Sequence, residues 1–114
     1  MSVEIANVIH ALAVIELSDP PRFLANFGFD SAAHDDTGQF FLRPTEKLSL
    51  TLDKADAVIQ VTSLSTPAVV YLATVVGSGP ELGNVFLQVL KVSDQTPVDG
   101  NFAQVVVFRC PTVD

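Results

Sequence analysis

The chain has 114 residues and a formal net charge of −7, with six Lys and Arg against thirteen Asp and Glu. This acidic balance, with the basic residues scattered singly, argues against nucleic acid or an anionic membrane surface as a partner. The single cysteine, Cys110, excludes an intramolecular disulfide and a cysteine-based zinc site. The length and a hydrophobic fraction of 48% predict one folded domain over residues 1–114.

Valine, isoleucine and threonine make up about a quarter of the chain, and this composition favours strands. Short apolar runs alternate with turn residues such as Gly, Pro, Asp and Ser throughout the sequence. In chain order we expect one helical turn at 22–27, a turn at 34–38, and strands at residues 8–17, 29–31, 39–43, 47–52, 57–63, 68–76, 85–92 and 102–109.

Short strands at intervals of about 8–12 residues predict an all-β fold, an antiparallel β-sandwich of about eight strands that is jelly-roll-like. Residues 68–72 and 105–108 are apolar at consecutive positions, so both faces of these strands need cover, from a second sheet or from a neighbouring subunit. The charged fraction of 17% is below the usual value of about 25% and points to assembly with other protein. The uncharged stretch 57–80 has polar residues at its centre, so we expect no membrane span and a soluble chain.

The most polar spot in the sequence is His34-Asp35-Asp36. These residue types could bind a metal or act as a general base. Consecutive residues converge poorly on one metal ion, however, and His and Asp are ordinary turn formers, so we favour a solvated hairpin tip. His10 lies in an apolar strand and is expected to be a buried, hydrogen-bonded residue or an interface residue. We therefore expect no catalytic residue, no metal and no cofactor, and the protein is not expected to be an enzyme.

Two further features look functional but have simpler readings. The segment 77–79 (Gly-Ser-Gly) is too short for a dinucleotide or phosphate loop and is read as a hairpin loop. The eight Phe and one Tyr come without any Trp, so a carbohydrate-stacking platform is not favoured. The pairs Phe40-Phe41 and Phe27/Phe29 are read as core.

Several segments resemble small β-sandwich modules of tailed-bacteriophage virion proteins. The resemblance rests on Pro-Arg-Phe-Leu-Ala-Asn-Phe-Gly-Phe at 21–29, Ser31, Gly-Gln-Phe-Phe-Leu at 38–42, Ala-Val-Ile-Gln-Val-Thr at 57–62, and Asp-Gly-Asn-Phe-Ala-Gln-Val-Val-Val-Phe-Arg at 99–109. It implies a role as a head decoration (cement) protein or as a distal tail-fibre module. No catalytic residues accompany it.

We expect the first role, a capsid decoration protein on the outer surface of the virion, because the sequence has no coiled-coil heptads or collagen repeat for a fibre shaft. Its expected partners are the major capsid protein and copies of itself, most simply as a homotrimer. Contacts are assigned to an N-terminal arm at 1–7, a C-terminal tail at 111–114 and the residues Val3, Ile5, Val8, His10, Pro111 and Val113.

Two alternatives stay open. One is a tail-fibre or adhesin module that binds a host receptor or glycan through the loops 34–38 and 77–83. The other is a small-ligand enzyme that uses His34, Asp35 and Asp36.

Overall fold

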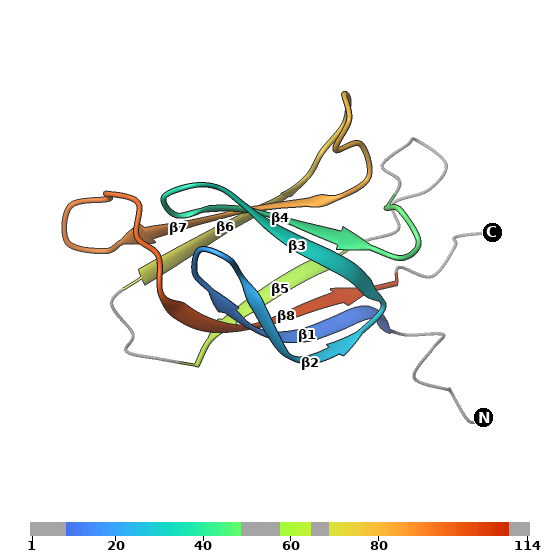
Figure 1. The fold of residues 1–114 in the computed structure, drawn as a ribbon, viewed down its shortest axis with the longest axis horizontal. Coiled ribbons are helices and arrows are strands. Elements are labelled where there is room, and N and C mark those ends of the chain that lie inside the picture. Colours follow the sequence, from blue (N-terminus) through green and yellow to red (C-terminus); the bar gives the residue numbers. More distant parts are fainter. Residues whose placement is uncertain (1–8, 49–57, 65–68, 110–114) are drawn as a thin grey trace.

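A computed structural model describes residues 9–48, 58–64 and 69–109. Its elements are all strands (Figure 1): β1 (Ile9–Leu17), β2 (Arg22–Phe27), β3 (Phe29–Asp36), β4 (Gln39–Pro44), β5 (Val58–Ser63), β6 (Val69–Val75), β7 (Val85–Lys91) and β8 (Asn101–Phe108). No helix in this described part of the chain is long and apolar enough to cross a membrane.

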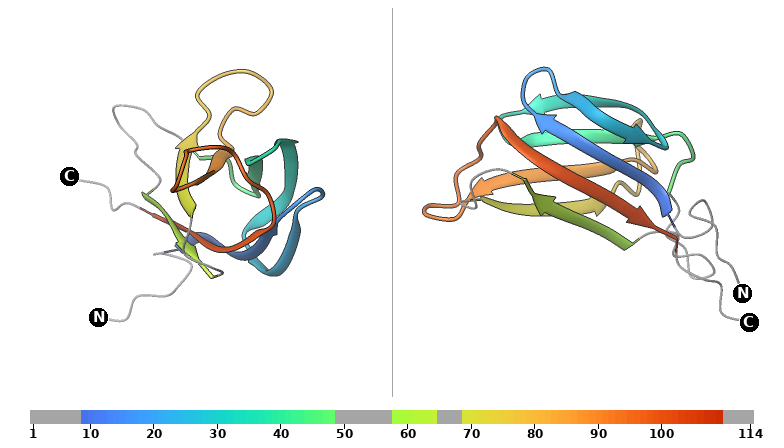
Figure 2. Two further views of the ribbon diagram at one scale, coloured as in Figure 1. Left: turned by 90° about the vertical axis from the view of Figure 1, so that its left-hand side faces the viewer. Right: turned by 90° about the horizontal axis from the view of Figure 1, so that it is seen from below.

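The strands form two antiparallel sheets of four strands each. Sheet A has the order β2-β1-β8-β5, and sheet B has the order β3-β4-β7-β6. The two sheets face each other across a common interior (Figure 2). The expected all-β antiparallel sandwich is confirmed. The chain crosses from sheet A to sheet B at Gly28, the single residue between β2 and β3.

Side chains that alternate along the strands build the core between the sheets. The period of two sends every second residue inward. In β1, for example, Ala11, Ala13, Ile15 and Leu17 are fully buried, while the residues between them are partly exposed. The opposite sheet supplies the largest fully buried side chain, Phe40. The fully buried members of this core also include Phe40, Leu42, Val85, Leu87, Val89, Ala103, Val105 and Val107.

Residues 22–27 form strand β2, so the predicted helical turn is wrong. The strand pairs antiparallel with β1, from Leu12–Phe27 to Glu16–Arg22, with a bulge between Val14 and Ile15. Phe23 packs against the core, and its ring stacks on Phe29 at a centroid distance of 6.0 Å. Pairing and burial of one aromatic ring outweigh the weak helical preference of a six-residue segment.

The predicted turn at 34–38 is too long. Strand β3 continues through Asp36, and only Thr37 and Gly38 lie in the turn before β4. His34, Asp35 and Asp36 are therefore strand residues and not a hairpin tip. Of the predicted strand 47–52, residues 47 and 48 carry no strand and residues 49–52 lie outside the described residues.

Candidate functional site

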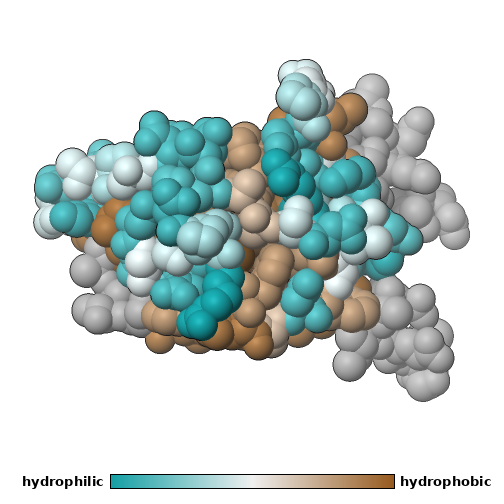
Figure 3. Space-filling view, viewed as in Figure 1, coloured by the Kyte–Doolittle hydropathy of each residue, from teal (hydrophilic) through white to brown (hydrophobic). Residues whose placement is uncertain are grey.

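The outer face of sheet A carries a group of apolar side chains, which Gln60, Thr62 and Gln104 interrupt. We define the apolar face as the outward side chains Leu12, Val14, Phe27, Val58, Val106 and Phe108. The register places Phe27, Leu12 and Val106 in one row across three strands. Phe27 is 47% exposed and Val58 is 54% exposed. Figure 3 shows hydrophobic residues gathered along the edge of the molecule where β1 and β2 lie.

Charges are almost absent from this sheet. Along its four strands the only Asp, Glu, Lys or Arg residues are Glu16 and Arg22. They lie at one end of the face and form an ion pair at 3.1 Å. The face can therefore dock on protein without stripping water from an unpaired charge, which is the costly part of burying a charged surface.

The second feature is a group of polar side chains around His34, at the end of the sandwich where β3 turns into β4. The His34 side chain is 15% exposed, with its Nε2 3.0 Å from Asp99 Oδ2 and its Nδ1 3.6 Å from Asp19 Oδ2. The other carboxylate oxygen of Asp99 accepts the backbone N–H of Gly38 at 2.6 Å. The imidazole thus connects β3 to the loops after β1 and β7. These contacts stabilise the fold and leave neither ring nitrogen directed at a ligand.

The alternative in which His34, Asp35 and Asp36 form one site is not supported, because adjacent strand residues point to opposite faces. The imidazole of His34 lies edge-on against the ring of buried Phe40, at a centroid distance of 5.3 Å. Asp35 lies on the outer face, and Asp36 accepts the backbone N–H of Thr37 at 2.7 Å. Among the described residues, no group of three or more His, Cys, Asp or Glu side chains could hold a metal ion.

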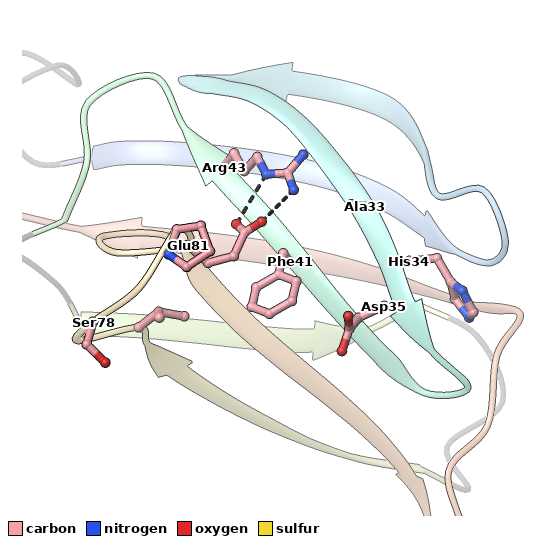
Figure 4. A pocket seen from close by; sticks show the side chains of 9 residues that line it. Ala33, His34, Asp35, Phe41, Arg43, Ser78 and Glu81 are labelled. Carbon is pink, nitrogen blue, oxygen red and sulfur yellow. Dashed lines mark hydrogen bonds and ion pairs between the residues drawn. The ribbon is translucent and has the colours of Figure 1, made fainter.

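The third feature is a hollow of about 530 Å³ on the outer face of sheet B (Figure 4). Its floor includes Phe41, and its wall is the β6–β7 loop, residues 76–84. Arg43 holds the loop through Glu81, with Nη2–Oε1 at 2.5 Å and Nε–Oε2 at 3.2 Å. The sequence predicts Phe41 in the core, and this is wrong: it faces outward and packs on Phe86 at a centroid distance of 5.1 Å.

A buried amide reinforces this ion pair. Asn84 is 2% exposed and donates Nδ2–H to Glu81 Oε2 at 2.6 Å. Its Oδ1 accepts a hydrogen bond from Lys47 Nζ at 2.5 Å. The hydrogen bond from Arg43 lowers the pKa of Glu81 below its ordinary value of 4.5; burial opposes this shift, and the bond from Asn84 supports it. The same contact raises the pKa of Arg43.

Acid is expected to weaken this connection. A carboxyl group whose pKa is lowered by folding stabilises the protein above its unfolded pKa, and the gain is lost as pH falls through the folded pKa. Glu81→Gln is therefore expected to destabilise the protein at about pH 7 and to make less difference at about pH 3. Urea unfolding at both pH values measures this. The control Glu46→Gln alters an exposed pair with Arg109 and is expected to change little. An equal cost of Glu81→Gln at both pH values would contradict the assignment.

The interface residues expected from the sequence fall mostly outside the described residues: Val3, Ile5, Val8, Pro111 and Val113. His10 is described. It is 7% exposed, and its Nε2 lies 2.7 Å from the carbonyl oxygen of Glu46. Its Nδ1 is buried without a hydrogen-bond partner. This matches the buried, hydrogen-bonded histidine considered from the sequence.

Sequence reasoning missed three features of the candidate sites: the apolar face as a unit, the Asp99 and Asp19 partners of His34, and the Arg43–Glu81 connection. The apolar face could have been predicted from the sequence, because β8 has apolar residues at its outward positions 106 and 108 as well as at its inward positions. The other two join residues far apart in the sequence.

Comparison of the chain with protein-family models, with curated proteins and with solved structures finds no match.

Proposed function

We propose that the protein is a virion structural protein that decorates the outer surface of a tailed-phage head. In this proposal the apolar face of sheet A docks on the major capsid protein, and the protein acts by adhesion and not by catalysis. The exposed, nearly charge-free apolar face is the observation that carries the proposal. The resemblance of the sequence to phage virion modules supplies the identity of the partner.

The pairing of the first and last strands also supports docking through sheet A. Ile9, the first residue of β1, pairs with Phe108, the last residue of β8. The described parts of the first and last strands of sheet A therefore begin and end at the same end of that sheet. The proposal assigns the contacts of the N-terminal arm and C-terminal tail to the shell and to sister copies in a homotrimer. We also propose that the strands are connected in the jelly-roll-like manner expected of such modules.

The energetics of docking are sufficient for such a role. Apolar burial contributes ~25 cal/mol per Å², so a few hundred Å² give several kcal/mol before the costs of association. A shell offers many equivalent sites, so a modest affinity per site still bridges neighbouring capsid subunits across the whole surface.

The proposal is tested by placing a charge on the apolar face. Val58→Asp is expected to lower binding to shells of the accompanying major capsid protein by about tenfold or more, because docking would bury an unpaired carboxylate. Co-sedimentation of purified protein with shells measures the bound fraction. Val58 is 54% exposed, so the fold should tolerate the change.

Val70→Asp is the matched control. Val70 is 44% exposed and lies on β6, an edge strand of sheet B, as Val58 lies on an edge strand of sheet A. Binding is expected to persist in this variant. Equal binding by wild type and Val58→Asp would reject sheet A as the docking face.

A further inference from the structure

We propose that the hollow on the outer face of sheet B is a binding site for a neutral saccharide, with the ring of Phe41 as its apolar floor and Asp35 and Ser78 as its hydrogen-bonding groups. The hollow is open to solvent, and its volume of about 530 Å³ falls within the range of small-ligand sites. The inference does not depend on docking through sheet A, because the hollow lies on the opposite sheet.

The wall of the hollow is fixed in place before any ligand arrives. Within the β6–β7 loop, Gly83 N–H donates to Val76 O and Val76 N–H donates to Asn84 O, each at 2.9 Å. The side chains of Arg43 and Asn84 then hold Glu81 from two sides. These contacts also tie the loop to the segment after β4, through Lys47 and Leu48. A wall held in this way favours binding, because a preorganised site loses less entropy when a ligand binds.

The groups around the floor match the two kinds of surface on a sugar ring. A pyranose has an apolar C–H face, which can lie on an aromatic ring, and hydroxyl groups at its edge, which need polar partners. Figure 4 shows Phe41 between Asp35 and Ser78. Neither the Asp35 carboxylate nor the Ser78 hydroxyl has a hydrogen-bond partner among the described residues. Both are available to hydroxyl groups of a ligand.

The charges of the side chains that line the hollow favour a neutral ligand. The Arg43 guanidinium is engaged by Glu81 through two hydrogen bonds, so it offers little to an anion. Asp35 then leaves the lining with one net negative charge, on a chain whose net charge is −7. Acidic sugars and phosphates are expected to be repelled. The polar atoms of His34 are turned away from the hollow toward Asp99, so the imidazole is not a ligand contact.

The test begins with the free, full-length protein on an array of neutral and acidic oligosaccharides. The strongest neutral saccharide is then titrated into the ¹⁵N-labelled protein. We expect binding to neutral saccharides, with amide shifts concentrated at Asp35, Phe41 and residues 76–84. The proposal is overturned if no saccharide binds, if acidic saccharides bind best, or if the shifts centre on another part of the sandwich.

Asp35→Ala is expected to weaken this binding by about tenfold or more, as loss of a hydrogen bond to a charged group does. Asp30→Ala is the matched control: Asp30 is an exposed aspartate of the same strand that does not line the hollow, and binding should stay within about twofold. Equal effects of the two substitutions would reject the site. Val58→Asp should bind the saccharide normally, so failure of the hollow and failure of the docking face give different results.

Discussion

Replacing Phe40 by alanine is expected to remove about 3–5 kcal/mol from the free energy of unfolding. Phe40 is fully buried between the sheets, and its ring is in edge-on contact with the imidazole of His34. Truncation leaves a cavity that the surrounding strands fill only in part. A domain of this size is stable by only about 5–15 kcal/mol, so the loss is a large share of the total. Urea unfolding at neutral pH measures it.

Phe41→Ala is the matched control, because the next residue carries the same ring on the other face of β4. Phe41 is only half-buried and packs on Phe86 at the surface of sheet B. Less apolar area is returned to water and no closed cavity forms, so its cost is expected to be clearly smaller. Equal costs for the two substitutions would contradict the assignment of Phe40 to the core and Phe41 to the hollow.

Gly38→Ala is expected to cost about 2–4 kcal/mol, for two separate reasons. Gly38 has φ +68°, a conformation in which a side chain is strained. An added Cβ would also lie 2.6 Å from Val89 O and 2.8 Å from Val98 N. Both are backbone atoms, so the clash is relieved only if strand β7 or the segment before β8 moves. The N–H of Gly38 also holds Asp99, so the displacement would reach His34.

Gly79→Ala separates the two causes. Gly79 has φ +81°, but an added Cβ would meet nothing within 4 Å. This variant is expected to lose only about 1–2 kcal/mol, the cost of the left-handed backbone conformation. Thermal or urea unfolding of both variants measures the difference. If Gly38→Ala were no worse than Gly79→Ala, the close approach of Gly38 to strand β7 would be wrong.

Local pattern was enough to locate most strands in the sequence. Strands β4 to β8 lie where alternating or continuous apolar runs end at Gly, Pro or Asp, and their observed bounds differ from the expected ones by only one residue at either end. Strand β2 was missed because its residues are mostly exposed, so they show no clear alternation. Its conformation is set by pairing with β1, which is a tertiary interaction.

The candidate sites depend on residues that sequence distance hides. His34 and Asp99 are separated by 65 positions, and Arg43 and Glu81 by 38. No spacing rule connects such pairs: Arg43 and Glu81 meet only when the two hairpins of sheet B lie side by side, and Asp99 reaches His34 from the connection between β7 and β8. The outward position of Phe41 was readable in principle: when Phe40 faces the core, its strand neighbour must face the other way.

We propose that this chain is part of the shell of a phage head. The most direct measurement is its copy number in purified phage particles, by quantitative mass spectrometry with heads and tails separated. We expect the chain to stay with the heads, at a fixed ratio to the major capsid protein. Its absence from particles, or a few copies confined to the tail fraction, would contradict the account and favour a receptor-binding module.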